Sequence, residues 1–210
     1  GITAGNSNNI GNVNLTARKS TSSITFATAG STFNALTVLA GNDVNVNFPV
    51  ITDTGVLELR AGNDVLLAAA GDLTSAGNVI IVADNDGNLS GTGGAVTMTD
   101  GAVIDAGANT ITMAADENLT LGQLLTTNAT SSAVILYSYS GGIVDGGDTD
   151  QDITAASGGL ILNVSDGSGT AAKGIEASLN IGFGEVVNTV SASISGGVYS
   201  GAATLMTMGL

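Results

Sequence analysis

Residues 36–46 read LTVLAGNDVNV, and residues 57–67 read LELRAGNDVLL, so the same pattern returns after 21 positions. Weaker copies follow at 80–89, 111–119 and 134–138. Self-similarity with a period of 20 to 50 residues is typical of solenoids and other repeat folds. The repeat has seven anchor positions, with a mean step of roughly 21 residues: Val38, Leu59, Ile81, Met98, Met113, Leu136 and Leu162.

Within each repeat, apolar residues alternate with polar ones over short runs that end in Gly, Asn or Asp, as in Leu57/Leu59 and Ile111/Met113. A period of two indicates strands, and no long apolar pattern of helical period occurs. About 21 residues accommodate two or three short strands and their corners. We therefore predict an all-β parallel β-helix (β-solenoid) with coils of about 21 residues and little or no helix. Pro49 should lie at a corner, because proline cannot donate to a strand ladder.

The predicted organisation has three parts. Residues 1–35 form N-terminal coils, residues 36–180 form the β-helix repeats, and residues 181–210 form C-terminal strands that are a candidate segment for pairing between subunits. Loops of variable length are expected near 84–94 and 145–159. The opening residues lack the basic and apolar regions of a signal peptide, so we expect the chain to start after a cleaved signal or inside a longer protein.

The composition excludes several classes of chemistry. The chain has no Cys and no His, and its net charge is −14, from 4 basic and 18 acidic residues. Disulfides, Ser-His or Cys-His nucleophile pairs and zinc sites with the usual ligands are therefore excluded. An acidic surface repels nucleic acid and anionic lipid, so we expect neither as a partner. The uncharged stretch 186–210 is rich in Ser, Thr, Gly and Asn, which argues against membrane insertion.

Residues 101–122, GAVIDAGANTITMAADENLTLG, resemble the coils of filamentous-haemagglutinin-like and other giant repetitive bacterial surface adhesins, the β-strand repeat family. Residues 141–147 and 158–163 have the same character. The resemblance covers about residues 36–180 and is one of pattern. It implies a right-handed parallel β-helix that is exported to the cell surface. Neither the Asn-Pro-containing secretion signature of the two-partner family nor the aromatic-ended barrel of autotransporters is present in this sequence.

We therefore expect an extracellular structural and adhesive protein of a bacterial surface, a stiff spacer and binding surface without catalysis. We assign no catalytic, cofactor-binding or metal-binding residue. One alternative is a self-assembling extracellular filament or surface-layer subunit that stacks end to end through open β-ladder ends. Another is a carbohydrate-active β-helix enzyme, which would need paired carboxylates such as Asp84/Asp86 or Asp100/Asp105. Glycans or proteins of host or neighbouring cells are the candidate binding partners of an adhesin.

Calcium is the one candidate cofactor. The stretch 145–152 holds four carboxylates at close spacing, and hard oxygen ligands of this kind suit calcium; they are Asp145, Asp148, Asp150 and Asp152. Asp84 and Asp86 make a second, weaker match. Neither stretch reproduces an EF-hand loop, because the required Gly and closing Glu are missing at the expected positions. The alternative to a calcium site is a solvated acidic loop, which is the more common role of such a stretch.

Tyr137 and Tyr139 are two residues apart and should share one strand face. They are candidates for sugar stacking, with packing at a corner as the alternative. The pairs Thr97/Thr99 and Thr110/Thr112 are interpreted as ordinary outward-facing strand residues rather than an ice-binding array.

Overall fold

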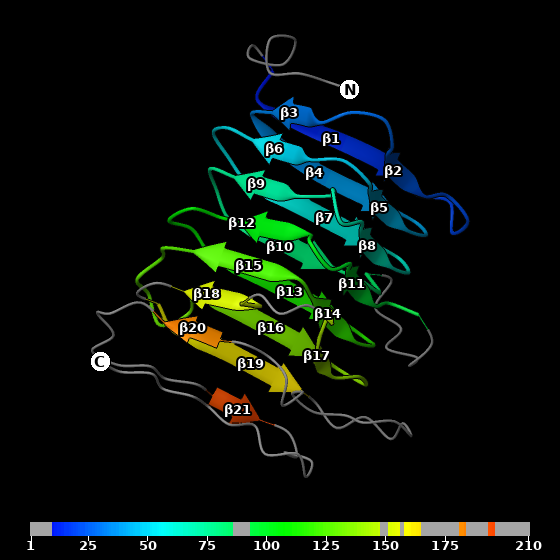
Figure 1. The fold of residues 1–210 in the computed structure, drawn as a ribbon. Helices are drawn as coiled ribbons and strands as arrows, with labels where there is room; N and C mark the ends of the chain where they lie inside the picture. Colours follow the sequence, from blue (N-terminus) through cyan, green and yellow to red (C-terminus); the bar gives the residue numbers. More distant parts are fainter. Residues whose placement is uncertain are drawn as a thin grey trace.

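In the computed structural model the chain winds into a β-solenoid built from three parallel sheets, with about six turns spaced about 23 residues apart. The structure describes residues 10–85, 93–147, 151–155, 158–164, 181–183 and 193–195. No helix occurs in these ranges. The predicted parallel β-helix is therefore confirmed, and each regular coil contributes one strand to each sheet (Figure 1).

Sheet 1 has eight strands, and each pairs in parallel with its neighbours in the adjoining coils. Its strands, in order, are β1 (Asn12–Ala17), β4 (Ala35–Ala40), β7 (Leu57–Ala61), β10 (Val79–Val82), β13 (Ile111–Ala115), β16 (Val134–Ser138), β19 (Leu160–Val164) and β21 (Ser193–Ser195). It is the longest ladder of the molecule.

Sheets 2 and 3 complete each coil with shorter strands. Sheet 2 contains β2 (Ile24–Phe26), β5 (Val44–Val46), β8 (Val65–Leu67), β11 (Val96–Met98), β14 (Leu119–Leu121) and β17 (Ile143–Asp145). Sheet 3 contains β3 (Ser31–Phe33), β6 (Val50–Thr52), β9 (Leu73–Ser75), β12 (Val103–Asp105), β15 (Gln123–Thr126), β18 (Ile153–Ala155) and β20 (Ile181–Phe183). We call the turns from sheet 1 to sheet 2 the first corner, from sheet 2 to sheet 3 the second, and from sheet 3 to sheet 1 the third.

The core lies between the three sheets and consists of columns of like side chains. In sheet 1 the middle column is formed by Val38, Leu59, Ile81, Met113 and Leu136, which are stacked in register and are all fully buried. Alternation along each strand sends every second side chain inward, because successive residues of a strand point to opposite faces. These five repeat anchors therefore form one column. Leu162, in the next strand, is paired in register with Leu136.

Met98 is the exception among the anchors, and the assignment to this column is wrong. Met98 lies in β11 of sheet 2 and is paired with Leu67. The next member of the column after Ile81 is Met113. The sequence step between them is long, because the connection between β10 and β11 spans residues 83–95. An alternating triplet such as Val96–Met98 has the same pattern in every sheet, so its sequence could not show which sheet it joins.

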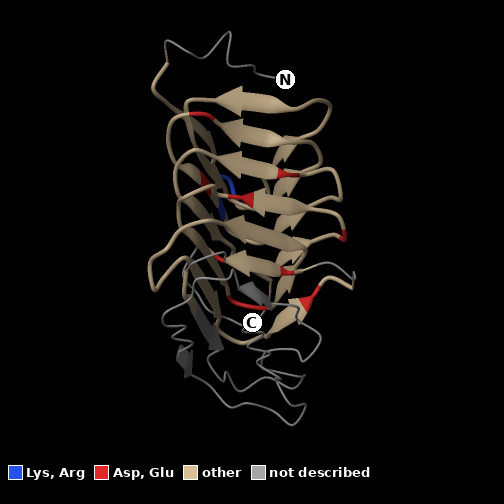
Figure 2. Ribbon diagram, turned by 60° about the vertical axis from the view of Figure 1, so that its left-hand side comes forward, with Lys and Arg blue, Asp and Glu red and all other residues tan. Residues whose placement is uncertain are grey.

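The corners hold the residues that the ladder excludes. Pro49 lies at the second corner between β5 and β6, as predicted, and its carbonyl oxygen accepts a 2.9 Å hydrogen bond from the amide of Ser31. Figure 2 shows that acidic positions gather at strand ends and turns rather than in strand centres. The charged groups of the chain are therefore placed mainly by its corners.

The core column predicts a sharp contrast between two neighbouring isoleucines of β10. Ile81 is fully buried, whereas Ile80 is half-buried on the outer face. We expect Ile81→Ala to lower the free energy of unfolding by about 2–5 kcal/mol, since it removes buried methylenes and leaves a cavity. Ile80→Ala, the matched control, should cost clearly less. Urea unfolding followed by circular dichroism measures both, and equal losses would contradict the assigned faces.

Candidate functional site

The first corner is built from a repeated Gly-Asn-Asp turn at 41–43 and 62–64. The amide of Gly62 donates a 3.0 Å hydrogen bond to the carbonyl oxygen of Ala40 in the coil above. A Cβ atom on Gly62 would lie 2.5 Å from the carbonyl oxygen of Gly41, so no larger residue fits without displacing the backbone. Close stacking of successive turns therefore requires glycine at this position of the repeat.

The carboxylate of Asp43 joins three successive coils at this corner. One oxygen, Oδ1, accepts a 2.8 Å hydrogen bond from Nδ2 of Asn63 in the coil below. The other, Oδ2, accepts from Nδ2 of Asn42 at 2.9 Å and from Oγ of Ser23, in the coil above, at 3.3 Å. The residue is half-buried. Asp43 therefore acts as an acceptor that holds coils together.

Asp64 repeats this role one coil further on. Its Oδ1 accepts hydrogen bonds from the backbone amides of Ala95, at 2.9 Å, and Gly94, at 3.2 Å. These amides belong to the segment that leads into β11. In the sequence alone, Gly-Asn-Asp indicates only a turn. Its return after 21 residues was the available sign that the two carboxylates stack and bind neighbouring coils.

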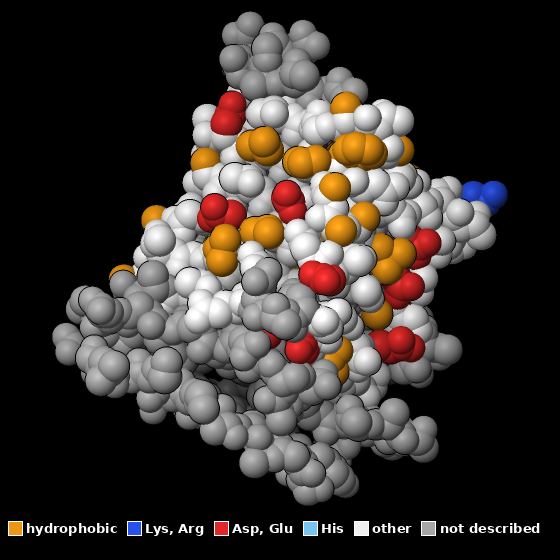
Figure 3. Space-filling model, in the orientation of Figure 1, with side chains coloured by type: hydrophobic (Ala, Val, Ile, Leu, Met, Phe, Trp, Pro, Cys, Tyr) orange, Lys and Arg blue, Asp and Glu red, His pale blue; other side chains and the backbone are white. Residues whose placement is uncertain are grey.

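Other acidic side chains also bind backbone amides across coils. Asp72 accepts a 3.0 Å hydrogen bond from the amide of Val103, and Glu117 accepts one of 2.8 Å from the amide of Gly93. On the face in Figure 3, acidic side chains are scattered among polar and small apolar ones. Several of the described acids therefore serve as acceptors for corner amides rather than as partners of basic side chains.

The third corner uses hydroxyl groups in place of carboxylates. Thr52 and Ser75 are buried and stacked, and their hydroxyl oxygens lie 2.8 Å apart. Thr52 also donates a 2.7 Å hydrogen bond to the carbonyl oxygen of Gly55. Three coils below Thr52, Thr126 donates a bond of the same length to the carbonyl oxygen of Asn109. These inward hydroxyls satisfy turn carbonyls that would otherwise be buried without a donor.

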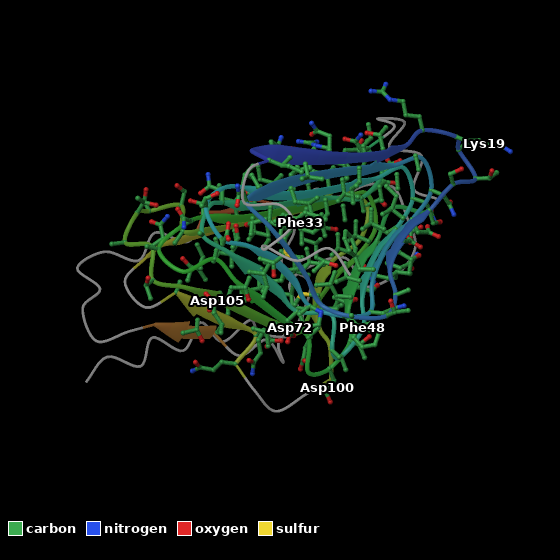
Figure 4. The ribbon with its side chains drawn as sticks, turned by 90° about the horizontal axis from the view of Figure 1, so that it is seen from above. Lys19, Phe33, Phe48, Asp72, Asp100 and Asp105 are labelled. Atoms are coloured by element: carbon green, nitrogen blue, oxygen red, sulfur yellow. The ribbon has the colours of Figure 1, made fainter. Side chains whose placement is uncertain are left out.

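The predicted acid pair Asp100/Asp105 lies on two different elements. Asp100 is exposed at the second corner, whereas Asp105 ends β12, where its Oδ1 accepts a 2.8 Å bond from the amide of Gly107. In Figure 4, viewed from above, Asp100 and Asp105 lie at separate places around the coil. A catalytic role of this pair stays a prediction.

Asp84 is buried and has a left-handed backbone, with φ of 60°. Its amide donates a 3.1 Å hydrogen bond to the carbonyl oxygen of Asn63, which ties it to the first corner. Its predicted partner Asp86 lies outside the described residues. Among the residues that the structure describes, no three Asp, Glu, His or Cys side chains are placed to hold a metal ion.

The main candidate calcium stretch, 145–152, is described only at its two ends. Asp145 ends β17, and its Oδ1 accepts a 2.7 Å hydrogen bond from the amide of Gly147. Asp152 is buried just before β18, and its carbonyl oxygen accepts a 2.7 Å bond from the amide of Leu124. Asp148 and Asp150 lie outside the described residues. Calcium binding by this stretch stays a prediction.

The outer face of sheet 1 carries one ion pair and one aromatic side chain. Nε of Arg60 lies 2.6 Å from Oε1 of Glu58, and its Nη1 donates a 3.1 Å hydrogen bond to Oδ1 of Asn85. Tyr137 lies in the same outward column as Arg60, three strands away, and is half-buried. Tyr139 follows the end of β16. Sugar stacking by these tyrosines stays a prediction.

Comparison with known proteins adds no further assignment. The chain matches no family model, no curated protein and no solved structure. In the described ranges there is also no helix of the length and apolar character that crossing a membrane requires. The resemblance to surface adhesins therefore rests on the sequence pattern alone.

The corner carboxylates predict different effects for two aspartates of the same coil. Asp43→Ala removes an acceptor that several donors share, so we expect a loss of unfolding free energy of about 1–3 kcal/mol. Asp53→Ala removes the same charge from an exposed position and should change stability little. Thermal unfolding of both variants measures the difference. If Asp53→Ala destabilised the protein as much as Asp43→Ala, net charge rather than corner bonding would be responsible.

Proposed function

We propose that this chain is an extracellular structural and adhesive β-solenoid of a bacterial surface protein, and that it acts as a stiff spacer and binding surface without catalysis. The observation that carries the proposal is the three-sheet ladder, in which the six coils from β1 to β18 are each bonded to the next in every sheet. Such an array gives a fixed length and a repeated surface, which is what a spacer needs.

A role without catalysis is supported by the way the described acids are used. Asp43, Asp64, Asp72 and Glu117 all accept hydrogen bonds from groups of neighbouring coils. A general acid or base must instead reach a substrate proton, and a glycosidase needs two such carboxyl groups facing one site. The bonded carboxylates contribute to the ladder itself.

We place the contacts with other molecules on the corner loops. Between β7 and β8 the first corner is a turn of residues 62–64, whereas between β10 and β11 it spans 83–95. The outward column of sheet 2 carries instead one side chain per coil on a regular ladder; its members are Thr25, Asn45, Leu66, Thr97, Thr120 and Val144. Loops carried on a rigid scaffold are where binding residues concentrate.

An extracellular location is part of the same proposal. It is supported by the adhesin-like pattern of residues 101–122 and by the absence of Cys from the sequence. Small residues, an acidic balance and no thiols together suit a protein that works outside the bacterial cell.

Adhesion is tested by coating beads with the chain, incubating them with cultured epithelial cells and with an array of surface glycans, and measuring how many beads are retained. We expect the intact chain to retain the beads and a variant with residues 86–92 scrambled, at unchanged composition, to lose most of this retention. The scrambled variant should keep the strand spectrum by circular dichroism. Thr97→Asn on the flat outer face is the control and should retain the beads.

Two results would contradict the proposal, the first its adhesive role and the second its placement of binding on the corner loops. Beads carrying the intact chain are not retained by any cell or glycan surface, or the scrambled variant is retained as well as the intact chain. The second result would leave binding in place but assign it to the coils.

A further inference from the structure

We propose that Asp100 is a site of spontaneous backbone modification, at which the folded chain converts aspartate to isoaspartate through attack by the amide of Gly101. The inference is independent of the adhesive role, because it concerns the chemistry of one turn. It rests on the geometry of that turn and on the contrast with a second pair of the same residue types, Asp145 and Gly146, which the fold holds differently.

The reaction needs only the two residues and water. The amide nitrogen of Gly101 bonds to the carboxyl carbon Cγ of Asp100, and the amide proton and the carboxyl hydroxyl leave together as water. A second water then opens the five-membered succinimide at either of its two carbonyl carbons. One opening restores aspartate, and the other leaves the main chain running through Cγ, which is isoaspartate. Glycine hinders this attack least, because it has no Cβ.

The first observation is the turn that carries the pair. Asp100 and Gly101 are exposed at the second corner between β11 and β12, on the outside of the solenoid (Figure 4). The amide of Ala102 donates a 2.9 Å hydrogen bond to the carbonyl oxygen of Thr99 and closes the turn. Gly101 has φ of 90°, which a type II turn requires at its third residue. Asp100 and Gly101 are therefore the two central residues of a tight exposed turn.

The second observation is that both reacting groups are available. Within the described ranges, neither the amide of Gly101 nor the carboxylate of Asp100 has a hydrogen-bond partner. A backbone amide in such a position does not have to leave a partner before it attacks. The nucleophile and the carbon that it attacks thus belong to adjacent residues, and both are open to water.

The third observation is that the corner has room for the product. A Cβ atom placed on Gly101 would meet no atom nearer than 3.6 Å, at Ala69 of the coil above. On either side of the turn, the amides of Thr99 and Val103 are bonded to the coil above, at 2.9 and 3.0 Å. The extra main-chain atom of isoaspartate enters between these two bonds. The coils should therefore stay stacked after the conversion.

The pair Asp145 and Gly146 differs in one decisive respect. The amide of Gly146 donates a 2.7 Å hydrogen bond to the carbonyl oxygen of Leu121 in the coil above. This amide must give up its bond before it can attack Cγ of Asp145. We therefore expect isoaspartate to form at Asp145 roughly tenfold more slowly than at Asp100, the factor that corresponds to the loss of one ordinary hydrogen bond.

The test follows isoaspartate at each pair while the full chain is kept for several weeks in a warm, mildly acidic buffer. An endoproteinase that cuts before aspartate leaves isoaspartate uncut, and electron-transfer fragmentation of the peptides identifies the modified residue. We expect Asp100 to convert about tenfold faster than Asp145 in the folded chain. In concentrated urea the two rates should become similar, because unfolding releases the amide of Gly146. Two further Asp-Gly pairs, at 86–87 and 166–167, lie outside the described residues and are measured on separate peptides.

Asp100→Glu is the matched control. It keeps the charge at this exposed position, but its side chain would have to close a six-membered ring, which forms far more slowly. We expect no conversion at position 100, an unchanged circular dichroism spectrum and an unchanged rate at Asp145. The proposal is overturned if Asp145 converts as fast as Asp100 in the folded chain, since the turn then gives no selectivity. It is equally overturned if Asp100 stays aspartate in the folded chain over the period in which it converts in urea.

Discussion

The structure depends on one constraint: each strand makes its backbone hydrogen bonds only with the coil above and the coil below. Strands stacked in this way lie about 4.8 Å apart, so residues one coil apart must be similar in size and polarity. The column through Val38, Leu59, Ile81, Met113 and Leu136 meets this requirement without a large aromatic residue. The alternating pattern, the repeat period and the glycines of the first corner all follow from it.

This constraint explains what the sequence could and could not predict. Stacking makes the period and the strand alternation visible in a single sequence, so the fold class can be predicted from it. Five of the seven predicted anchors lie in one fully buried column of sheet 1. Met98 was misplaced because residues 83–95 lengthen one coil, and a three-residue strand does not show which sheet it joins. The uses of Asp43, Asp64 and Asp72 were missed, because an acidic side chain bonded to an amide of another coil resembles a solvated acid in sequence.

The same constraint separates the molecule into regular sheets and corners of variable length. Strand pairing fixes the spacing within the sheets, whereas a corner can be as long as the connection 83–95, because its length does not interrupt the ladder. Carboxylates and hydroxyls at the corners supply acceptors and donors that the turns lack. A spacer role is thus a proposal that draws on this architecture.

Because the chain has no Cys, introduced cysteines can carry spin labels at chosen positions, and the distance between two labels tests the ladder most directly. Thr25 and Val144 lie in the outward column of sheet 2, five strand steps apart. The account predicts a narrow distribution near about 24 Å, from the strand spacing of about 4.8 Å. A broad distribution, or one centred far beyond this distance, would contradict the continuous in-register stack.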